Sequence, residues 1–250
     1  MDTMQVSNLP FLDLSEKQPF AIGDNRLCFR HPDDSGLCIK INRAGRAGRL
    51  RGQAPLYKRL RREKHFDDNW QEFYAFQQPA IRTGGPELWR HLPRCYGWVE
   101  TNLGPALISD FFADPSGDAA PTLEQYLKHH GRTPEIDEAL DEFCAFLRGS
   151  LVLTKNLLPH NLVVADLDRE LRLILIDGIG LATLLPLAKH STLLSRRHVE
   201  KRIRWFEHRL AWETGSRLES WQTAEAKFHR YARPRWRRAP SGRARGREEC

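Results

Sequence analysis

Short apolar segments separated by strong turn signals fill residues 19–41, whereas most of the helical patterns lie in the second half of the chain. Gly, Pro, Asn and Asp gather at 23–26 and again at 31–36, where they predict tight turns. Segments of four or five residues between such turns are typical of paired antiparallel strands. Three strands are therefore predicted, over residues 19–22, 27–30 and 37–41.

The rest of the chain adds one helix, a second strand pair and then a mainly helical half. Helices are predicted where apolar residues recur at helical spacing, and strands where they alternate or form short runs. Residues 42–54, rich in Gly and Arg, predict a mobile basic loop. The predicted helices cover 57–78, a short segment from Thr122, 135–149 and 193–212. The further predicted strands cover 92–100, 107–112, 162–164 and 171–176.

This order predicts an α+β fold of two lobes, a small antiparallel-sheet lobe followed by a mainly helical one. We expect an N-terminal extension at residues 1–17 and a folded domain at 18–226, with the lobes meeting near residue 112. Residues 227–250 are rich in Arg, Pro and Gly and are predicted to be a disordered basic tail. Nine of the 39 Lys and Arg and two of the 32 Asp and Glu lie in this tail, which accounts for the net charge of +7.

The cysteine pattern and hydropathy indicate a cytoplasmic protein. The five cysteines are scattered and form no C-x-x-C pair, which favours reduced thiols over a disulfide framework or a zinc site. No run of about 18 apolar residues is present, so no transmembrane segment is predicted. The first residues also lack the basic and apolar regions of a secretory signal.

Four residues in a particular order carry the chemistry that we consider most informative. Lys40 lies near the end of an early strand, Glu72 on the next helix, Asn161 just after a later helix, and Asp177 at the end of an apolar strand. A lysine held by a carboxylate can neutralise nucleotide phosphates, while amide and carboxylate oxygens can hold Mg²⁺ against them.

With these residues the chain resembles the protein-kinase-like superfamily and, within it, the bacterial YrbL family named for the PhoP regulatory network. The resemblance covers about residues 18–212. It is carried by GDNRLCFRHP at 23–32, CIKI at 38–41, LLPHN at 157–161 and DGIGLATLLPL at 177–187. It implies a kinase-like domain that binds ATP and Mg²⁺.

By the same resemblance, Lys40 is the strand lysine, and Asn161 and Asp177 are the metal ligands. Glu72 is the expected partner of Lys40, with Glu63 as the alternative. Gly23 and Asn25 belong to the turn that would cover the nucleotide, where three glycines are usual and only Gly23 is present. These two positions complete the predicted nucleotide site.

The largest departure from the kinase pattern concerns the residue that accepts the proton. The pattern His-Arg-Asp-Leu-Lys-Pro-x-Asn reads TKNLLPHN at residues 154–161, so Asn156 stands where the catalytic aspartate is expected. An amide cannot act as a base, but it can orient an acceptor hydroxyl, and positioning supplies much of the rate of phosphoryl transfer. Asn156 and Lys40 are therefore the candidate catalytic residues.

Three interpretations of function stay open at this point. The first is an atypical phosphotransferase that acts on a small-molecule, protein or cell-envelope substrate, and the second is a regulatory pseudokinase. The third is binding of nucleic acid, or of an anionic membrane surface, through the basic tail with its interleaved aromatic residues. The arginines that follow Lys40 are either a solvated loop or a recruiting surface for an anionic substrate; they are Arg43, Arg46, Arg49 and Arg51.

Overall fold

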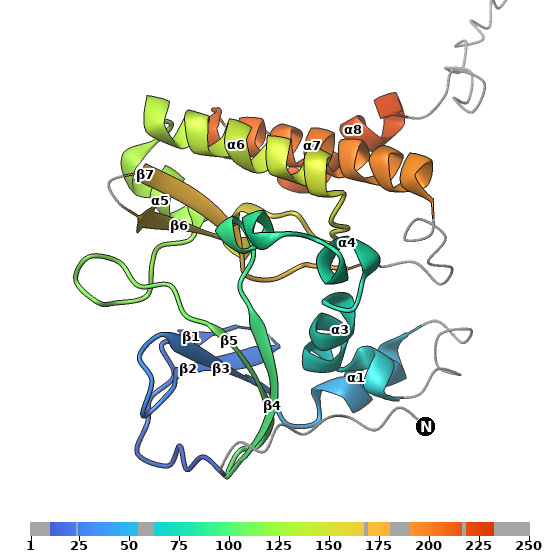
Figure 1. Ribbon diagram of the computed structural model, residues 1–250. Coiled ribbons are helices and arrows are strands. Elements are labelled where there is room, and N and C mark those ends of the chain that lie inside the picture. Colours follow the sequence, from blue (N-terminus) through green and yellow to red (C-terminus); the bar gives the residue numbers. More distant parts are fainter. Residues whose placement is uncertain are drawn as a thin grey trace, which may run out of the picture.

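The computed structural model describes residues 11–23, 25–54, 63–167, 170–180, 191–216 and 219–232. Within them the chain forms a five-stranded sheet with short helices, and a mainly helical part with a two-stranded sheet. Figure 1 shows the larger sheet below and the longest helices above it. The predicted α+β architecture of two lobes is therefore confirmed.

The N-lobe is built on an antiparallel sheet with the strand order β1-β2-β3-β5-β4. Its strands are β1 (Ala21–Ile22), β2 (Arg26–Arg30), β3 (Leu37–Asn42), β4 (Cys95–Thr101) and β5 (Gly104–Asp110). Because β3 is the central strand, Lys40 has Cys28 opposite it on one side and Leu107 on the other. Side chains alternate between the two faces of a strand, so Ile39 and Ile41 point away from Lys40 and into an apolar cluster.

Two residues of the predicted N-terminal extension belong to this cluster. Leu12 and Leu14 are 5% and 1% exposed and pack against the sheet. The backbone N–H of Leu12 donates to the carbonyl of Glu100 on β4 at 3.0 Å. The boundary predicted at residue 17 is therefore wrong, because two leucines from before it cover a sheet face that would otherwise expose apolar surface.

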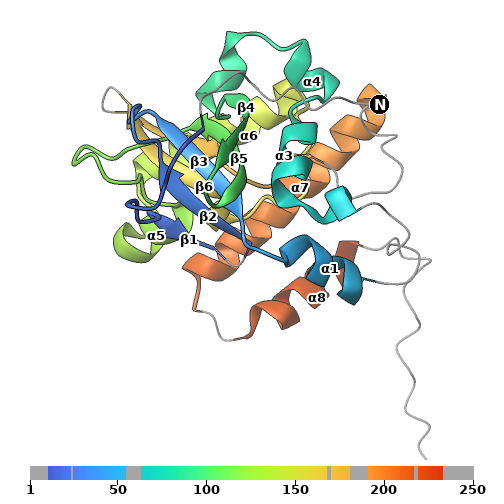
Figure 2. The same ribbon diagram turned by 90° about the horizontal axis from the view of Figure 1, so that it is seen from below.

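A chain of short helices links β3 to β4. They are α1 (Arg46–Gln53), the 3-10 helix η1 (Glu63–Phe66), α3 (Asp68–Ala75), α4 (Pro79–Arg82) and the 3-10 helix η2 (Pro86–Arg90). Helix α3 is capped by Asp67, whose carboxylate accepts from the backbone N–H of Trp70 at 2.7 Å. Figures 1 and 2 both show α1 and α3 to one side of the sheet.

The prediction of a mobile loop over residues 42–54 is wrong for α1. The helix begins after Gly45, which has a φ of +68°. Arg, Leu, Ala and Gln are good helix formers, and in this segment they outweigh two glycines. The predicted helix over 57–78 is also shorter and interrupted: its described part consists of η1 and α3, and residues 55–62 lie outside the described residues.

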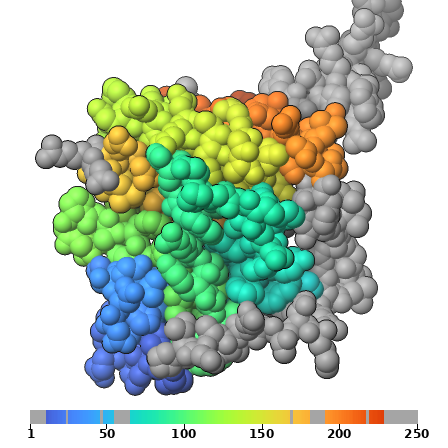
Figure 3. Space-filling model, viewed as in Figure 1, coloured from blue at the N-terminus to red at the C-terminus, as the bar shows by residue number. Residues whose placement is uncertain are grey.

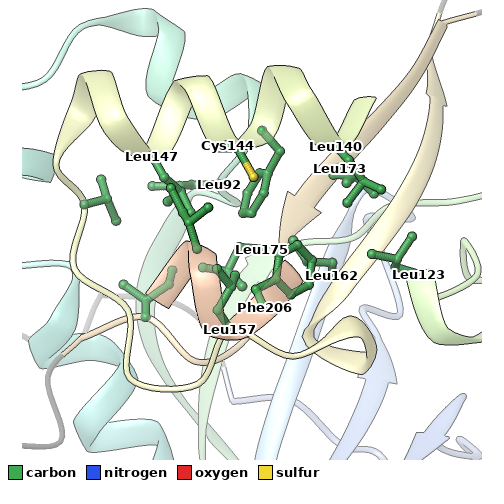
Figure 4. Packing of buried hydrophobic residues seen from close by; sticks show 14 of the residues in the cluster. Leu92, Leu123, Leu140, Cys144, Leu147, Leu157, Leu162, Leu173, Leu175 and Phe206 are labelled. Atoms are coloured by element: carbon green, nitrogen blue, oxygen red, sulfur yellow. The ribbon is translucent and has the colours of Figure 1, made fainter. Parts of the chain in front are cut away.

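The described part of the C-lobe contains two long helices, two shorter α-helices, one 3-10 helix and one hairpin. They are α5 (Leu123–His130), α6 (Pro134–Ser150), the 3-10 helix η3 (Pro159–Asn161), β6 (Leu162–Leu167), β7 (Glu170–Leu175), α7 (Thr192–Thr214) and α8 (Trp221–Ala232). Leucines of α6 and of the β6–β7 hairpin meet Phe206 of α7 in the largest apolar cluster (Figure 4). Thr122 is the N-cap residue of α5, as predicted, and forms a capping box with Gln125.

The helices between β3 and β4 also join the two lobes. Leu88 and Leu92 belong to the C-lobe cluster, although they precede β4 of the N-lobe in the chain. Figure 3 shows this segment in teal, filling the space between the blue strands and the yellow-green helix α6. The segment between β3 and β4, which includes α3, therefore packs against both lobes.

Helix α8 shortens the predicted tail. It continues to Ala232, so residues 227–232 are helical, and the tail as predicted begins too early. Trp221 of α8 has its ring centroid 5.6 Å from those of both Trp205 and Trp212 on α7. Contact between the aromatic rings holds α8 on α7. Residues 233–250 lie outside the described residues, so the proposed contact of the tail with nucleic acid or a membrane surface stays a prediction.

Across the described ranges, no helix is both long enough and apolar enough to cross a membrane.

Candidate functional site

Lys40 and Glu72 meet between the N-lobe sheet and helix α3. Lys40 Nζ lies 2.6 Å from Glu72 Oε1, and the two residues are 5% and 4% exposed. A second bond fixes the helix to the strand, because Asn69 Nδ2 donates to the carbonyl of Lys40 at 2.7 Å. The alternative partner, Glu63, has a side chain outside the described part of the chain. The structure therefore brings together the lysine and the glutamate that the sequence singles out.

The ammonium group of Lys40 also reaches the C-lobe. Nζ donates to the main-chain carbonyl of Ile176 at 2.9 Å, and Ile176 directly precedes Asp177. An ammonium group has three protons, and Glu72 and Ile176 accept two of them. Among the described residues no third acceptor is present, so one proton is left for a further acceptor such as a phosphate oxygen.

Arg26 belongs to this site, although the sequence analysis did not single it out. Its guanidinium forms an ion pair with Glu72 through one nitrogen, and its other terminal nitrogen lies 2.5 Å from Asp177 Oδ2. The first nitrogen also donates to Asn69 Oδ1 at 3.4 Å. A signal was present in the sequence: Arg26 opens β2 two residues before Cys28, which is paired with Lys40, so both cations lie on one sheet face.

The loop that contains Asn156 and Asn161 is tied to the turn after Asp177. Asn161 Nδ2 donates to the carbonyl of Asn156 at 3.0 Å, which leaves the amide oxygen of Asn161 as a ligand atom. The backbone N–H of Lys155 donates to the carbonyl of Gly178 at 2.7 Å. Gly178 has a φ of +84°, and a Cβ there would overlap the carbonyl oxygen of Asn156. Only glycine therefore allows these two segments to approach so closely.

The electrostatics of the site favour charged side chains throughout. Burial opposes the charged forms of Lys40 and Arg26, but the negative charges around them, mainly Glu72 with a contribution from Asp177, together more than offset it, so the pKa of each is raised above its usual value. Burial would also raise the pKa of Asp177. The charges of Arg26, Lys40 and Lys155 outweigh burial and hold that pKa well below its usual range.

Charge and exposure together describe what such a site can bind. Arg26, Lys40 and Lys155 supply three positive charges against the two carboxylates Glu72 and Asp177, which leaves an excess suited to an anion. The Asp177 side chain is 42% exposed, so its carboxylate can be reached from solvent. Lys155 was also missed by the sequence analysis; its Nζ donates to Gln71 Oε1 at 3.2 Å.

The donor set fits a hard divalent cation such as Mg²⁺ only in part. Asn161 presents an amide oxygen and Asp177 a carboxylate, and Mg²⁺ is commonly held by one or two protein oxygens with water and phosphate completing its shell. Within the described ranges, no group of three or more His, Cys, Asp and Glu side chains could hold a metal ion. The Oδ2 atom of Asp177 already forms an ion pair with Arg26.

The remaining predicted residues lie at the edges of the site. Asn156 is exposed, and its carbonyl, rather than its side chain, makes the contact to Asn161. Gly23 is exposed, and its N–H donates to the carbonyl of Arg26 at 2.9 Å, which closes the β1–β2 turn. Asn25 accepts at its carbonyl from Arg43, and its side-chain oxygen is buried without a partner among the described residues. These turn residues position Arg26 and, within the described part of the chain, make no contact with Lys40 or Asp177.

The sequence matches one protein family over most of its length and is similar to individual proteins from two bacteria. The chain matches the family described as "PhoP regulatory network protein YrbL" over residues 12–211. It is 28% identical over 193 residues to the uncharacterized protein YrbL of Escherichia coli K12 and to that of Shigella flexneri. Each of these matches covers 75% of this chain and 82% of the relative.

Among solved structures, the chain is similar to mutant forms of the kinase domain of PknI from Mycobacterium tuberculosis. For one of them the TM-score is 0.44 at 15% identity, with 76% of this chain and 68% of the other covered. For a second the TM-score is 0.44 at 16% identity, with coverage of 77% and 71%. The family match extends over most of the chain and includes every residue placed in the site above. The chain belongs to the YrbL family of PhoP regulatory network proteins.

Proposed function

We propose that the chain binds ATP with Mg²⁺ between its two lobes and transfers the terminal phosphoryl group to a small-molecule or envelope-related substrate. The observation that carries the proposal is the meeting of Lys40 and Glu72 from the N-lobe with the segment of Ile176 and Asp177 from the C-lobe. A strand lysine paired with a helix glutamate, next to a metal-binding aspartate, is the arrangement that phosphoryl transfer in protein kinases requires. The substrate class rests on the family resemblance alone.

Each residue has a role in this proposal. Lys40 holds the phosphates, and Glu72 holds Lys40 in place. Asn161 and Asp177 would hold Mg²⁺, which when bound neutralises charge on the phosphates. Asn156, which is exposed, orients the acceptor hydroxyl by a hydrogen bond.

The bonds, electrons and protons of the transfer can all be accounted for without a protein base. The acceptor oxygen forms a bond to the γ-phosphorus while the bond from that phosphorus to the β–γ bridging oxygen breaks, and ADP leaves with the electron pair. The hydroxyl proton passes to solvent, because the amide of Asn156 cannot accept it. The missing base lowers the rate by roughly 10²- to 10⁴-fold compared with an aspartate at this position.

Asn156 also supports a second candidate function, a pseudokinase that binds nucleotide and regulates a partner without transfer. The two candidates share the nucleotide site and differ only at the chemical step. Nucleotide binding is therefore tested first, and transfer second.

The binding test is a thermal unfolding series with ATP and Mg²⁺. A ligand at a hundredfold excess over its Kd stabilises the folded state by about 2.7 kcal/mol, which raises Tm by several degrees. We expect this rise in the wild type and in Lys128→Met, which alters an exposed lysine, but not in Lys40→Met or Asp177→Asn. No rise in the wild type with any nucleotide would refute the proposal.

The transfer test uses the same protein with [γ-³²P]ATP and a pool of small metabolites and envelope components. Label in a product that depends on Lys40 and Asp177 supports phosphotransfer. Nucleotide binding without label, in the wild type and in Asn156→Asp alike, supports the pseudokinase instead.

A further inference from the structure

Both carboxylate oxygens of Asp177 are engaged by the protein itself. Oδ1 accepts from the backbone N–H of Gly178 at 2.6 Å. Oδ2 lies 2.5 Å from a terminal nitrogen of Arg26. A metal ion bound through Oδ2 would therefore compete with the guanidinium for this oxygen.

Arg26 is held at this place from the opposite side. It is 8% exposed, and its other terminal nitrogen is paired with Glu72 and donates to Asn69 Oδ1 on helix α3. The side chain of Asp177, in contrast, is 42% exposed. The guanidinium therefore approaches the carboxylate from inside the N-lobe, while the open side of the carboxylate faces the solvent.

We propose that Arg26 and a divalent metal ion are alternative cationic partners of Asp177, so that Arg26 sets how strongly nucleotide binding depends on metal. The nucleotide half of this inference rests on the proposed function, whereas the metal half concerns Asp177 and Arg26 alone. Arg26 acts here as a resident cation: it neutralises Asp177 and lies beside the phosphate-binding lysine.

Two opposite effects of Arg26 follow from its charge. A fixed positive charge beside Oδ2 repels a divalent cation, and the guanidinium competes with that cation for the same oxygen. Arg26 therefore weakens the binding of metal in the absence of nucleotide. The same charge adds to those of Lys40 and Lys155, so Arg26 strengthens the binding of a nucleotide in the absence of metal. A residue that merely supported the fold would not shift the two affinities in opposite directions.

The test measures two affinities in the full chain and in Arg26→Gln. Free Mn²⁺ is followed by electron paramagnetic resonance without nucleotide, and ATP binding is followed by calorimetry in the presence of EDTA. We expect Arg26→Gln to bind Mn²⁺ about tenfold tighter or more and metal-free ATP about tenfold more weakly, the usual scale of coupling between linked sites. Addition of Mg²⁺ should restore ATP binding in this variant.

Arg30→Gln is the matched control. Arg30 ends the same strand, but its guanidinium donates to the carbonyls of Ser35 and Gly117 and, among the described residues, makes no contact with the site. Both affinities should stay at the wild-type values in this variant. If Arg26→Gln does not fold, Arg26→Lys takes its place: a lysine can pair with Glu72 but cannot bridge both carboxylates, so Mn²⁺ affinity should again increase, by a smaller factor.

The outcomes separate this inference from the proposed function. An Mn²⁺ affinity in the folded Arg26 variants equal to that of the wild type, or no Mn²⁺ binding in any of them, overturns the inference. Tighter Mn²⁺ binding in the variants, together with no ATP binding by any protein with or without metal, supports the metal half and refutes the proposed function.

Discussion

The side-chain amide of Asn161 donates to the main-chain carbonyl of Asn156 at 3.0 Å. This bond connects the candidate metal ligand to the residue that replaces the catalytic aspartate. It also decides which atom of Asn161 faces the site, because the nitrogen is used and the oxygen is left for a cation. The close approach of Gly178 to the same carbonyl keeps the loop in place.

Replacement of Gly178 by alanine tests this close approach. Gly178→Ala should destabilise the protein by more than about 2 kcal/mol, because a positive φ alone costs an L-residue roughly 1–2 kcal/mol and its Cβ would also overlap the carbonyl of Asn156. Gly117→Ala is the control, since Gly117 has a φ of +90° but no atom within 4 Å of a Cβ. Urea unfolding measures both, and equal losses in the two variants would contradict the prediction.

Glu72 should contribute more to stability than any exposed glutamate. Glu72→Gln removes the charge that compensates two buried cations, Lys40 and Arg26, and loss of one partner from a buried ion pair costs about 3–5 kcal/mol. Glu87→Gln, at a side chain that is 78% exposed, should change the free energy of unfolding by less than about 0.5 kcal/mol. Chemical denaturation measures this loss of unfolding free energy. A loss below about 1 kcal/mol in Glu72→Gln would show that other groups neutralise Lys40 and Arg26.

The stability contribution of Asp177 should depend on pH in a defined direction. Its pKa in the folded state is lowered, so its ionised form stabilises the fold above the unfolded value of 3.8. That contribution is progressively lost as the pH falls below this value. The difference in unfolding free energy between wild type and Asp177→Asn should therefore be constant from about pH 7 to 5 and shrink below about pH 4. A difference that does not change with pH would contradict the assignment.

Cys28 should be the most reactive of the four cysteines that the structure describes. A hydrogen bond from Cys38 is the main cause that lowers the pKa of Cys28, to about 7, and the charges of Lys40 and Arg26 add to it. Burial raises the pKa of Cys95 and of Cys144 to about 11. The thiolate is the reactive form, so alkylation of Cys28 by iodoacetamide should rise with pH through a midpoint of about 7.

Mass spectrometry of tryptic peptides measures this reaction site by site, in a background where Cys250 is replaced by serine. Cys28→Ser identifies the peptide, and ATP bound at Lys40 should slow its modification because Cys28 lies opposite Lys40 in the sheet. A midpoint near 9, the usual value for a cysteine, would contradict the lowered pKa.

A base restored at position 156 should reveal whether proton transfer limits the reaction. Asn156→Asp should increase phosphotransfer by roughly 10²- to 10⁴-fold, the contribution typical of general base catalysis. His160→Asp, at an exposed residue of the same loop, adds the same charge without the same position and should have no such effect. The rate of labelled product formation at saturating ATP is the measurement, and an equal effect of both substitutions would assign the gain to charge alone.

Much of the fold could be predicted because its signals are local. The turn at 31–36, the alternation along β3 and the helical spacing in α6 each depend on residues close together in the chain, and these elements lie where the sequence predicts them. The family motif likewise led to Lys40 and Glu72, which form an ion pair, and to Asp177 and Asn161, which lie on neighbouring segments of the other lobe. Helix α1 was missed because the glycines and arginines of its short segment give conflicting local preferences.

The sequence by itself determined the strand and helix periods, the capping residues and the chemical types at the site. Only the tertiary structure decided which cations face which carboxylates. The strand pattern places Arg26 on the same sheet face as Lys40, but its partners Glu72 and Asp177 come from helix α3 and from the other lobe, so only the packing shows its role. Leu12 is buried for the same reason, by pairing with β4. Such contacts depend on how the lobes pack, and packing brings together residues that no local pattern relates.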